Sequence, residues 1–492
     1  MRWTLTLPRL KFVDLFAGLG GFHIALRRLG HECVFASEIN DELQAVYLRN
    51  FPEMSGKVYG DIRQCVNLVP EHDILCAGFP CQPFSKSGKQ DGLKDSTRGT
   101  LFSQIERVVR TRRPSYIILE NVGNFEVHDS GRTWAIVRQS LRNLGYNVRG
   151  TTHVRSGGHG LISPHHLGFP HHRERFFVVA SLRDLPLDPF PTISRARKTS
   201  LSEIILSRHE LTETELNETR LTGSQIDCIN HWNRLLKSIP ERTEIQSPLW
   251  GDELWARYPY HSHSPYHAFR TTWSSGQGYR GRTPKAVVAA LSRLPSYART
   301  HQRKFPAWKV KFIRENRAWF KEMRAYLPYG WVSELKDFPP SFRKLEWNCR
   351  SGTRDLWTQI LQFRPSGLRA KCYNSSPSLV AMTETQIPIL GKERRFIARR
   401  EGLRLQGFPD SHQLPLKRGD AFAALGNSVH IDVVAEIASR LLTHAHEPYL
   451  RVSDADQSPD QSSRLLPPHG VKRQFEVAAQ LGAIVQRSRT DL

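Results

Sequence analysis

The stretch KFVDLFAGLGGFHIALRRLG, residues 11–30, indicates the fold of this chain. Its first six residues are a short apolar run that leads into a glycine-rich turn from Ala17 to Gly21. The run FHIALRRLG then has the apolar spacing of a helix, and Gly30 suits the C-terminal end of that helix. A strand, a tight turn and a helix in this order form the first unit of an α/β fold.

Strand-like runs alternate with helical stretches from there to residue 185. Four further runs are apolar and flanked by turn residues, as is typical of buried strands: CVFASE, HDILCAG, SYIILENV and RFFVVAS. This alternation predicts a doubly wound, mostly parallel sheet. Near the other end of the chain, REGLRLQGF (400–408) and SVHIDVVAEIASRLL (428–442) are predicted helices.

The composition favours a polyanionic partner. The chain has 492 residues, enough for two or three domains, and 70 Lys and Arg against 47 Asp and Glu give a net charge of +23. A surplus of this size is typical of nucleic-acid binding, less often of an anionic membrane surface; the bland alternative is a surface that is only solubilising. No apolar run reaches the roughly 18 residues of a membrane span, and no secretory signal is found.

The seven scattered cysteines include no C-x-x-C pair. This pattern favours neither a disulfide framework nor a structural zinc site, and it suits a reducing, intracellular setting. We therefore expect a cytoplasmic protein.

Residues 251–350 differ in amino-acid composition from the rest of the chain. They hold 19 Lys and Arg against 7 Asp and Glu, together with 19 of the 48 aromatic residues. Basic residues interleaved with aromatic ones suit phosphate contacts and base stacking, although many of these rings belong to a core. The Ser-, Pro- and Asp-rich start of the tail, 446–492, predicts partial disorder there.

Polar groups at the ends of the first predicted strands suit a nucleoside ligand. The glycine-rich turn in DLFAGLGGF (14–22) would let a ligand approach the backbone and a helix N-terminus, although such turns often only pack tightly. Its spacing is G-x-G-G rather than the dinucleotide pattern G-x-G-x-x-G. Glu38 closes the second strand, where an acid can accept hydrogen bonds from ribose hydroxyls, and Asp61 could accept from an adenine amino group. Together they predict a pocket for an adenosine without a pyrophosphate.

Reactive candidates follow the next strands. Cys81 lies in GFPCQPFS (78–85), between prolines at the predicted carboxyl edge of the sheet, whereas Cys33 and Cys76 are inside strands and read as inert packing. Glu120 closes the apolar strand YIILE and is either a surface cap or a proton donor with a pKa raised by burial. Arg173 and Arg175 alternate in HHRERFF (171–177), where the alternative is a solvated charge run.

These blocks, in this order, resemble the DNA (cytosine-5)-methyltransferase family. DLFAGLGGF resembles its S-adenosylmethionine motif, GFPCQPFS its catalytic cysteine loop, and ENV and R-E-R its two cytosine-holding motifs. REGLRLQGFPD and GNSV (426–429) resemble its last two blocks. The chain departs from the family pattern at His171, where Gln is usual, and at Ala398-Arg399, where Thr-Pro is usual.

The resemblance implies a Rossmann-like S-adenosylmethionine-dependent methyltransferase fold with a second, smaller target-recognition domain. The implied parts are a catalytic domain from 1–185 and 376–445, a variable recognition domain at 186–375 and the tail. The implied partner is double-stranded DNA from which the target cytosine is flipped. The enzyme would be a monomeric restriction-modification methylase whose cognate endonuclease, where there is one, acts separately, and no metal is implied.

Carried over residue by residue, the resemblance implies three groups of site residues. Cys81 would add to carbon 6 of cytosine, Glu120 would hydrogen-bond the ring, and Arg175, helped by Arg173, would hold the O2 carbonyl. The residues implied for S-adenosyl-L-methionine are Phe16, Gly18, Leu19, Gly20, Gly21, Glu38, Asp61, Ile62, Pro80, Leu101, Asn427 and Ser428. The residues implied for DNA contact are Ser85, Lys89 and Arg98.

Three rival functions are each disfavoured by a different feature of the sequence. A transfer-RNA cytosine-5 methyltransferase is disfavoured by the long basic region, since that branch of the family carries a short one. An inactive DNA-binding relative is disfavoured because Cys81, Glu120 and Arg175 are all intact. A nicotinamide oxidoreductase is disfavoured by the missing third glycine.

Overall fold

The computed structural model describes residues 8–80, 101–152, 159–186, 188–191, 200–268, 289, 291–349, 353–379 and 384–444. The predictions for Cys81, Ser85, Lys89 and Arg98 and for the tail 446–492 concern residues outside these ranges.

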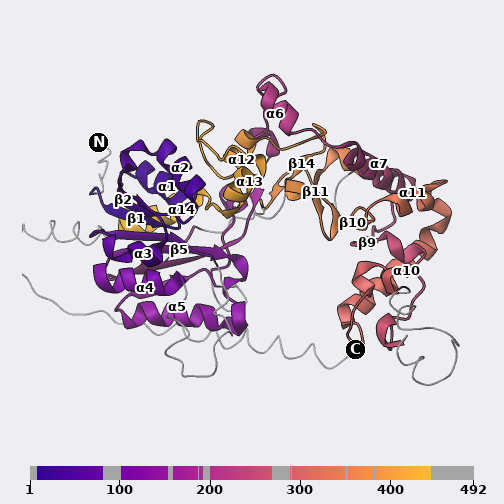
Figure 1. The fold of residues 1–492 in the computed structure, drawn as a ribbon, viewed down its shortest axis with the longest axis horizontal. Helices are drawn as coiled ribbons and strands as arrows, with labels where there is room; N and C mark the ends of the chain where they lie inside the picture. The colour runs from indigo at the N-terminus through magenta and orange to yellow at the C-terminus, as the bar shows by residue number, and fades with distance from the viewer. Residues whose placement is uncertain are drawn as a thin grey trace, which may run out of the picture. The chain divides into compact units, whose positions relative to one another are not determined.

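A seven-stranded sheet carries the first part of the chain (Figure 1). Its strands are β1 (Lys11–Leu15), β2 (Glu32–Ser37), β3 (Val58–Tyr59), β4 (Ile74–Gly78), β5 (Tyr116–Val122), β6 (Asn147–Gly150) and β8 (Arg175–Ser181). Their order is β3-β2-β1-β4-β5-β8-β6, with β1 to β5 parallel and β8 antiparallel to both of its neighbours. The predicted doubly wound, mostly parallel sheet is confirmed. Strands β3 and β6 have two and four residues, too few for a recognisable pattern, and the sequence did not predict them.

Helices cover both faces of this sheet. One face carries α1 (Gly21–Arg28), α2 (Asp41–Asn50) and α14 (Ile431–His444); the other carries α3 (Ile62–Cys65), α4 (Leu101–Arg112) and α5 (Arg132–Asn143) (Figure 1). The alternation along β1 shows why: Phe12 packs into one core, and Val13 and Leu15 into the other. The predicted first helix is confirmed, and Gly30 follows it with a left-handed φ of 89°.

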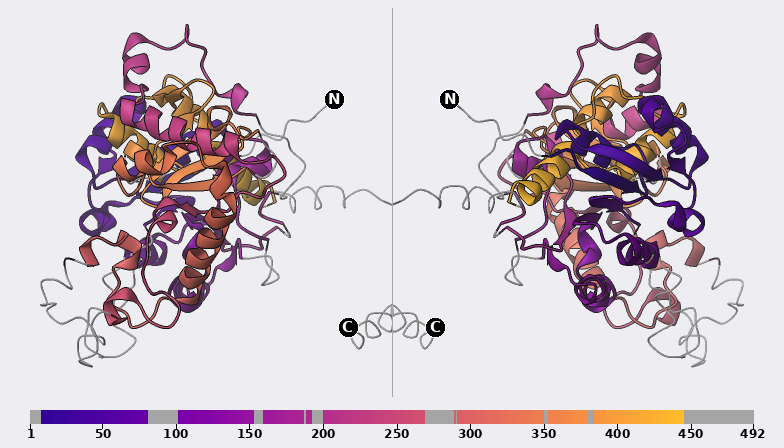
Figure 2. Two further views of the ribbon diagram at one scale, coloured as in Figure 1. Left: turned by 90° about the vertical axis from the view of Figure 1, so that its right-hand side faces the viewer. Right: turned by 90° about the vertical axis from the view of Figure 1, so that its left-hand side faces the viewer.

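The C-terminal part of the chain returns to the first strand-helix unit. Helices α12 (Arg399–Leu405), α13 (Arg418–Asn427) and α14 confirm the two predicted helical regions. Helix α14 packs against α1 (Figure 1), and Figure 2 shows the same fold from two further sides. The stretch Arg418–Thr443 is long and apolar enough to cross a membrane, which the sequence analysis does not predict, but 67% of its apolar window is buried in the fold. It therefore reads as core helix.

A six-stranded sheet of order β15-β14-β11-β12-β10-β9 is formed by later residues. Its strands are β9 (Leu249–Trp250), β10 (Lys344–Asn348), β11 (Ile360–Arg364), β12 (Gly367–Lys371), β14 (Ile389–Leu390) and β15 (Arg395–Phe396). Its pairs are antiparallel except β10 with β12. The sheet thus takes strands from both sides of residue 375. Among the described residues, the same part of the chain also contains the helices α6 (Glu213–Glu218), α7 (Gly223–Ser238), α10 (Ala307–Glu322) and α11 (Trp331–Asp337).

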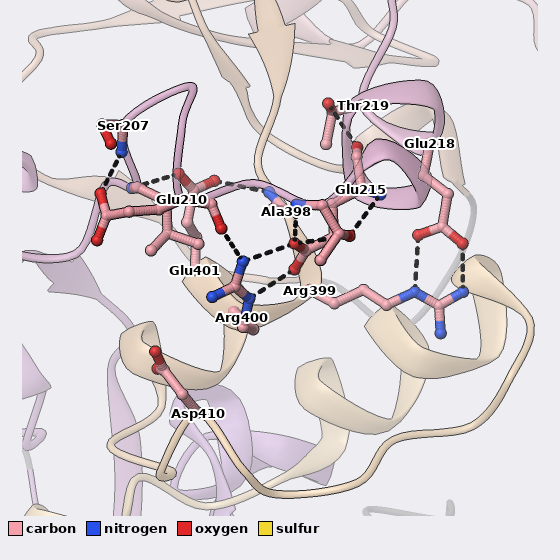
Figure 3. Close-up of polar contacts among 12 residues, drawn as sticks. Ser207, Glu210, Glu215, Glu218, Thr219, Ala398, Arg399, Arg400, Glu401 and Asp410 are labelled. Atoms are coloured by element: carbon pink, nitrogen blue, oxygen red, sulfur yellow. Dashed lines mark hydrogen bonds and ion pairs between the residues drawn. The ribbon is translucent and has the colours of Figure 1, made fainter.

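Ion pairs attach α6 to the start of α12 (Figure 3). Glu218 accepts two hydrogen bonds of 2.8 Å from Arg399, and Glu215 binds Arg400 at 2.7 and 2.8 Å. We call these four residues the α6–α12 cluster. It includes Arg399, one of the two positions at which the block departs from the family pattern. The bond from Arg400 lowers the pKa of Glu215 to about 2.

The other departure, Ala398, is at the N-cap of α12, where it has no side-chain acceptor. The N–H of Ala398 instead donates to Glu401 at 2.7 Å. Glu401 is fully buried and is also held by Arg395 at 2.6 Å and by the N–H of Leu206 at 2.9 Å. The helix start is therefore fixed by a buried carboxylate rather than by a capping hydroxyl.

Candidate active site

A cavity of about 440 Å³ opens at the carboxyl ends of the parallel strands. It takes residues from the turn after β1, the ends of β2, β4 and β5, the start of β8 and the turn after α13. The predicted site residues that line it are Phe16, Gly18, Gly21, Glu38, Asp61, Ile62, Pro80, Leu101, Glu120, Arg173, Arg175, Asn427 and Ser428. Ligands of α/β folds bind at this edge of the sheet, and the volume suits a nucleoside-sized molecule.

The glycine-rich turn forms one wall of the cavity. Phe16 has a φ of 60° and Gly18 of 52°, so the backbone turns through the left-handed region at both positions. An aromatic residue rarely adopts that conformation, and such outliers gather at ligand sites. A Cβ atom on Gly21 would lie 2.6 Å from Val429, which explains why only glycine fits between the turn and the residue after Ser428.

Leu19 and Gly20 do not line the cavity. Leu19 is buried in the hydrophobic core with 1% of its surface exposed. A Cβ atom on Gly20 would lie 2.4 Å from the ring of Phe51, and its φ is 77°. Both residues therefore shape the turn from behind rather than from the cavity side.

Two acids stand on the β2 side. Glu38 accepts the N–H of Gly18 through one oxygen and that of Asn40 through the other, both at 2.9 Å. These bonds fix the carboxylate beside the turn. Asp61 caps α3 and binds the guanidinium of Arg63, which lowers the pKa of Asp61.

Glu120 and Arg175 meet inside the cavity wall. Glu120 is the fifth residue of β5, and β8 runs antiparallel so that its first residue, Arg175, pairs with Val122. This register brings Nε of Arg175 to 2.9 Å from Oε1 of Glu120. Only 6% of Glu120 is exposed. Burial raises the pKa of Glu120, and the positive charge of Arg175 opposes that effect.

Asn121 is a site residue that the sequence analysis missed. Its side-chain amide donates a 2.9 Å hydrogen bond to the carbonyl of Phe79, and it lines the cavity. Phe79 is two residues before Cys81 in the chain, and Pro80, the last residue described before it, also lines the cavity. The signal was present in the ENV block, in which only the acid was assigned a role.

Arg173 is buried and its terminal nitrogens are taken up by the protein itself. One binds the carbonyls of Gly426 at 2.7 Å and Ser428 at 2.8 Å. The other is 3.2 Å from the carbonyl of Leu379 and 3.5 Å from the hydroxyl of Ser378. Arg173 therefore ties the start of β8 to two segments that are more than 200 residues away.

His171, the other departure from the family pattern, is also structural. It is fully buried, and its Nδ1 donates to the carbonyl of Leu405 at the end of α12 at 2.9 Å. His171 therefore joins β7 (His171–His172) to the end of α12 by a buried hydrogen bond.

The chain matches the family described as C-5 cytosine-specific DNA methylase over residues 10–443. It belongs to that family. The resemblance of the motif blocks is confirmed, and the protein is an enzyme, a DNA (cytosine-5)-methyltransferase. The alternative of a nicotinamide oxidoreductase is thereby excluded.

Several curated methyltransferases are similar to this methylase. Type II methyltransferase M.AluI of Cellulosimicrobium cellulans is 33% identical over 87% of this chain and 91% of its own length. M.HgiCI of Herpetosiphon aurantiacus is 28% identical over 89% and 98%. M.HhaI of Haemophilus parahaemolyticus is 45% identical over 37% of this chain and 53% of its own length.

Proposed function

We propose that this methylase transfers a methyl group from S-adenosylmethionine to carbon 5 of a flipped-out cytosine in a short DNA sequence, as a Type II modification enzyme. The observation that supports this most is the buried Glu120–Arg175 pair, which shares one cavity with the glycine-rich turn and Glu38. A carboxyl group and a guanidinium side by side match the N3, amino and O2 edge of a cytosine. The Type II assignment comes from the similar methyltransferases, which carry that name.

The cavity fits the adenosine part of such a cofactor. The hydroxyl of Ser37 is buried, has no hydrogen-bond partner among the described residues, and lines the cavity. An unpartnered buried polar group is costly unless a ligand satisfies it. Phe16 would lie against the adenine with Ile62, Glu38 would bind the ribose, and Asn427 and Ser428 would close the pocket. When bound, S-adenosylmethionine supplies an electrophilic methyl group on a sulfonium ion.

The chain's own residues would activate the cytosine. Carbon 5 is a poor nucleophile until the thiolate of Cys81 bonds to carbon 6 and makes the ring enamine-like. Glu120 would hydrogen-bond N3 and the exocyclic amine; burial raises the pKa of its carboxyl group, and the charge of Arg175 opposes that shift. Carbon 5 then takes the methyl group, a base such as water removes the proton of carbon 5, and the sulfur–carbon bond breaks to release 5-methylcytosine and the thiolate of Cys81.

The two arginines would have different roles. Arg175 reaches the cavity beside Glu120, so it would hold the O2 carbonyl of the base. The terminal nitrogens of Arg173 donate hydrogen bonds to protein carbonyls. We therefore assign Arg173 the role of a positioning residue and not that of a second contact to the base.

Recognition of the surrounding sequence would come from residues 186–375, with β14 and β15 completing the same six-stranded sheet from beyond residue 375. Residues 1–185 and the rest of 376–445 would form the catalytic part. Ser85, Lys89 and Arg98 remain proposed DNA contacts, and action as a monomer, separate from any cognate endonuclease, remains part of the proposal. The net charge of +23 supports an extended contact with DNA.

The test is transfer of tritium from labelled S-adenosylmethionine to duplex DNA and, in parallel, to transfer RNA. We expect label in DNA alone, at carbon 5 of cytosine after digestion. Label in transfer RNA alone would contradict the DNA assignment, and label in neither would favour an inactive DNA-binding relative.

A further inference from the structure

The outer face of α10 carries cations for which the fold provides little compensation. Its exposed positions follow one another at helical spacing and include the cations Lys311, Arg314 and Lys321, with one acid, Glu322, at the C-terminal end. At 100° per residue these three lie within an arc of about 80° and extend over about 15 Å. We call them the α10 stripe; Trp308, with 55% of its surface exposed, stands at its N-terminal end.

The opposite face of α10 is anchored. Ile313 and Phe320 are buried, and the buried side chain of Asn316 accepts the N–H of Trp250 in β9 at 2.6 Å. Its amide also donates to the carbonyl of Pro248 at 3.0 Å. The helix is therefore a rigid support for whatever its outer face contacts.

The cation on the inner side of α10, Arg317, is held by an acid and two aromatic rings of the fold. Arg317 binds the buried carboxylate of Glu253 at 2.8 Å and lies over the rings of Tyr258 and Tyr260. The same carboxylate accepts the hydroxyl of Tyr297 at 2.7 Å. The charge of Arg317 is thus compensated by the buried carboxylate of Glu253.

The stripe shows the reverse pattern. Within the described part of the chain, Arg314 and Lys321 form no ion pair, and Lys311 has only a 3.7 Å contact with Glu315 on the same helix. Three outward cations on a fixed helix have room for an external row of anions. Phosphates of one DNA strand recur about every 3.4 Å along the axis, so about 15 Å corresponds to four or five of them.

We propose that the α10 stripe binds the sugar-phosphate backbone of duplex DNA without reading its sequence. This inference rests on the proposed DNA substrate and adds a contact surface outside the cavity. Since each phosphate contact contributes about 0.9 to the dependence of log Kd on log salt, three contacts contribute about 2.7.

The test compares two triple variants of the full chain by fluorescence anisotropy over a range of salt concentrations. In Lys311→Gln/Arg314→Gln/Lys321→Gln we expect the salt slope to fall by about 2 to 3 on any duplex sequence. The control, Arg138→Gln/Arg142→Gln/Arg183→Gln, loses the same charge from other exposed positions and should change the slope by less than about 0.5. Thermal unfolding checks that both variants fold.

An unchanged slope in the stripe variant would overturn the proposal, and so would an equal fall in the control. Methyl transfer at saturating DNA separates this inference from the proposed function. A wild-type protein that binds DNA with the expected slope but transfers no methyl group would refute the proposed function alone.

Discussion

Replacing Arg173 with methionine separates a positioning residue from a base-binding one. Methionine has a similar length but no hydrogen-bond donor. The change would remove the bonds of 2.7 and 2.8 Å to the carbonyls of Gly426 and Ser428 and the 3.2 Å bond to that of Leu379. We therefore expect a loss of stability together with a loosened cofactor pocket, because Ser428 lines the cavity.

The magnitude follows from the carbonyls left behind. A buried acceptor that loses its partner costs about 1 to 3 kcal/mol, so three carbonyls give about 3 to 9 kcal/mol. Removing a buried charge and relaxing the segment offset part of this, which leaves an expected loss of about 3 to 5 kcal/mol. If about 1.4 kcal/mol of the loss falls on the bound pocket, the Kd for S-adenosylmethionine rises about tenfold.

Urea unfolding and calorimetric titration measure the two effects. The midpoint of unfolding should fall at an unchanged m-value, and cofactor binding should weaken. The matched control is Arg175→Met, which faces the cavity and should lose most of its methyl transfer while its midpoint falls less. The reasoning is refuted if Arg173→Met unfolds at the wild-type midpoint and loses only DNA-dependent steps.

Three further outcomes follow from the same structure. Glu120→Gln removes the ionisable partner of Arg175 and should lower single-turnover methyl transfer about 10²- to 10⁴-fold; near-wild-type rates would contradict a proton-holding role. Gly20→Ala adds a Cβ atom 2.4 Å from the ring of Phe51 at a φ of 77°, and it should lower the free energy of unfolding in urea by about 2 to 4 kcal/mol. In the control Gly18→Ala the new Cβ atom meets nothing within 4 Å, so the loss should be about 1 kcal/mol. Equal losses would show that the contact with Phe51 is unimportant. Arg400 lowers the pKa of Glu215 to about 2, so the pair contributes stability that is present above pH 4.5 and is lost as the pH falls toward 2; solvent screening limits this contribution to about 1 kcal/mol. Glu215→Gln should lack this part of the acid sensitivity, and an unchanged urea midpoint profile would argue against the pair.

The catalytic sheet could be predicted because its strands are long, apolar and punctuated by turns. The run from Lys11 to Gly30 gave the strand, turn and helix correctly, and the carboxyl ends of parallel strands bring Glu38 and Glu120 to one edge for topological reasons. The reversed direction of β8, which carries Arg175 to that edge, is not encoded in any local pattern.

The roles of other site residues depend on partners that are far away in the chain. Arg173 reads locally as a charged residue before a strand, and only its contacts with Gly426 and Ser428 show it to be a buried tie. The α6–α12 cluster likewise joins segments about 180 residues apart. No periodicity or spacing in the sequence can reveal such contacts, since they arise when the tertiary fold closes.

A covalent complex with DNA containing 5-fluorocytosine is the most direct probe of the proposed reaction, because fluorine at carbon 5 cannot leave as a proton would and the thiol remains bonded to the base. With S-adenosylmethionine present, the wild-type chain should form a complex that survives denaturing electrophoresis, and Cys81→Ala should form none. A complex that persists in Cys81→Ala, or a wild-type enzyme that methylates ordinary DNA yet never traps the fluorinated base, would contradict nucleophilic catalysis by Cys81.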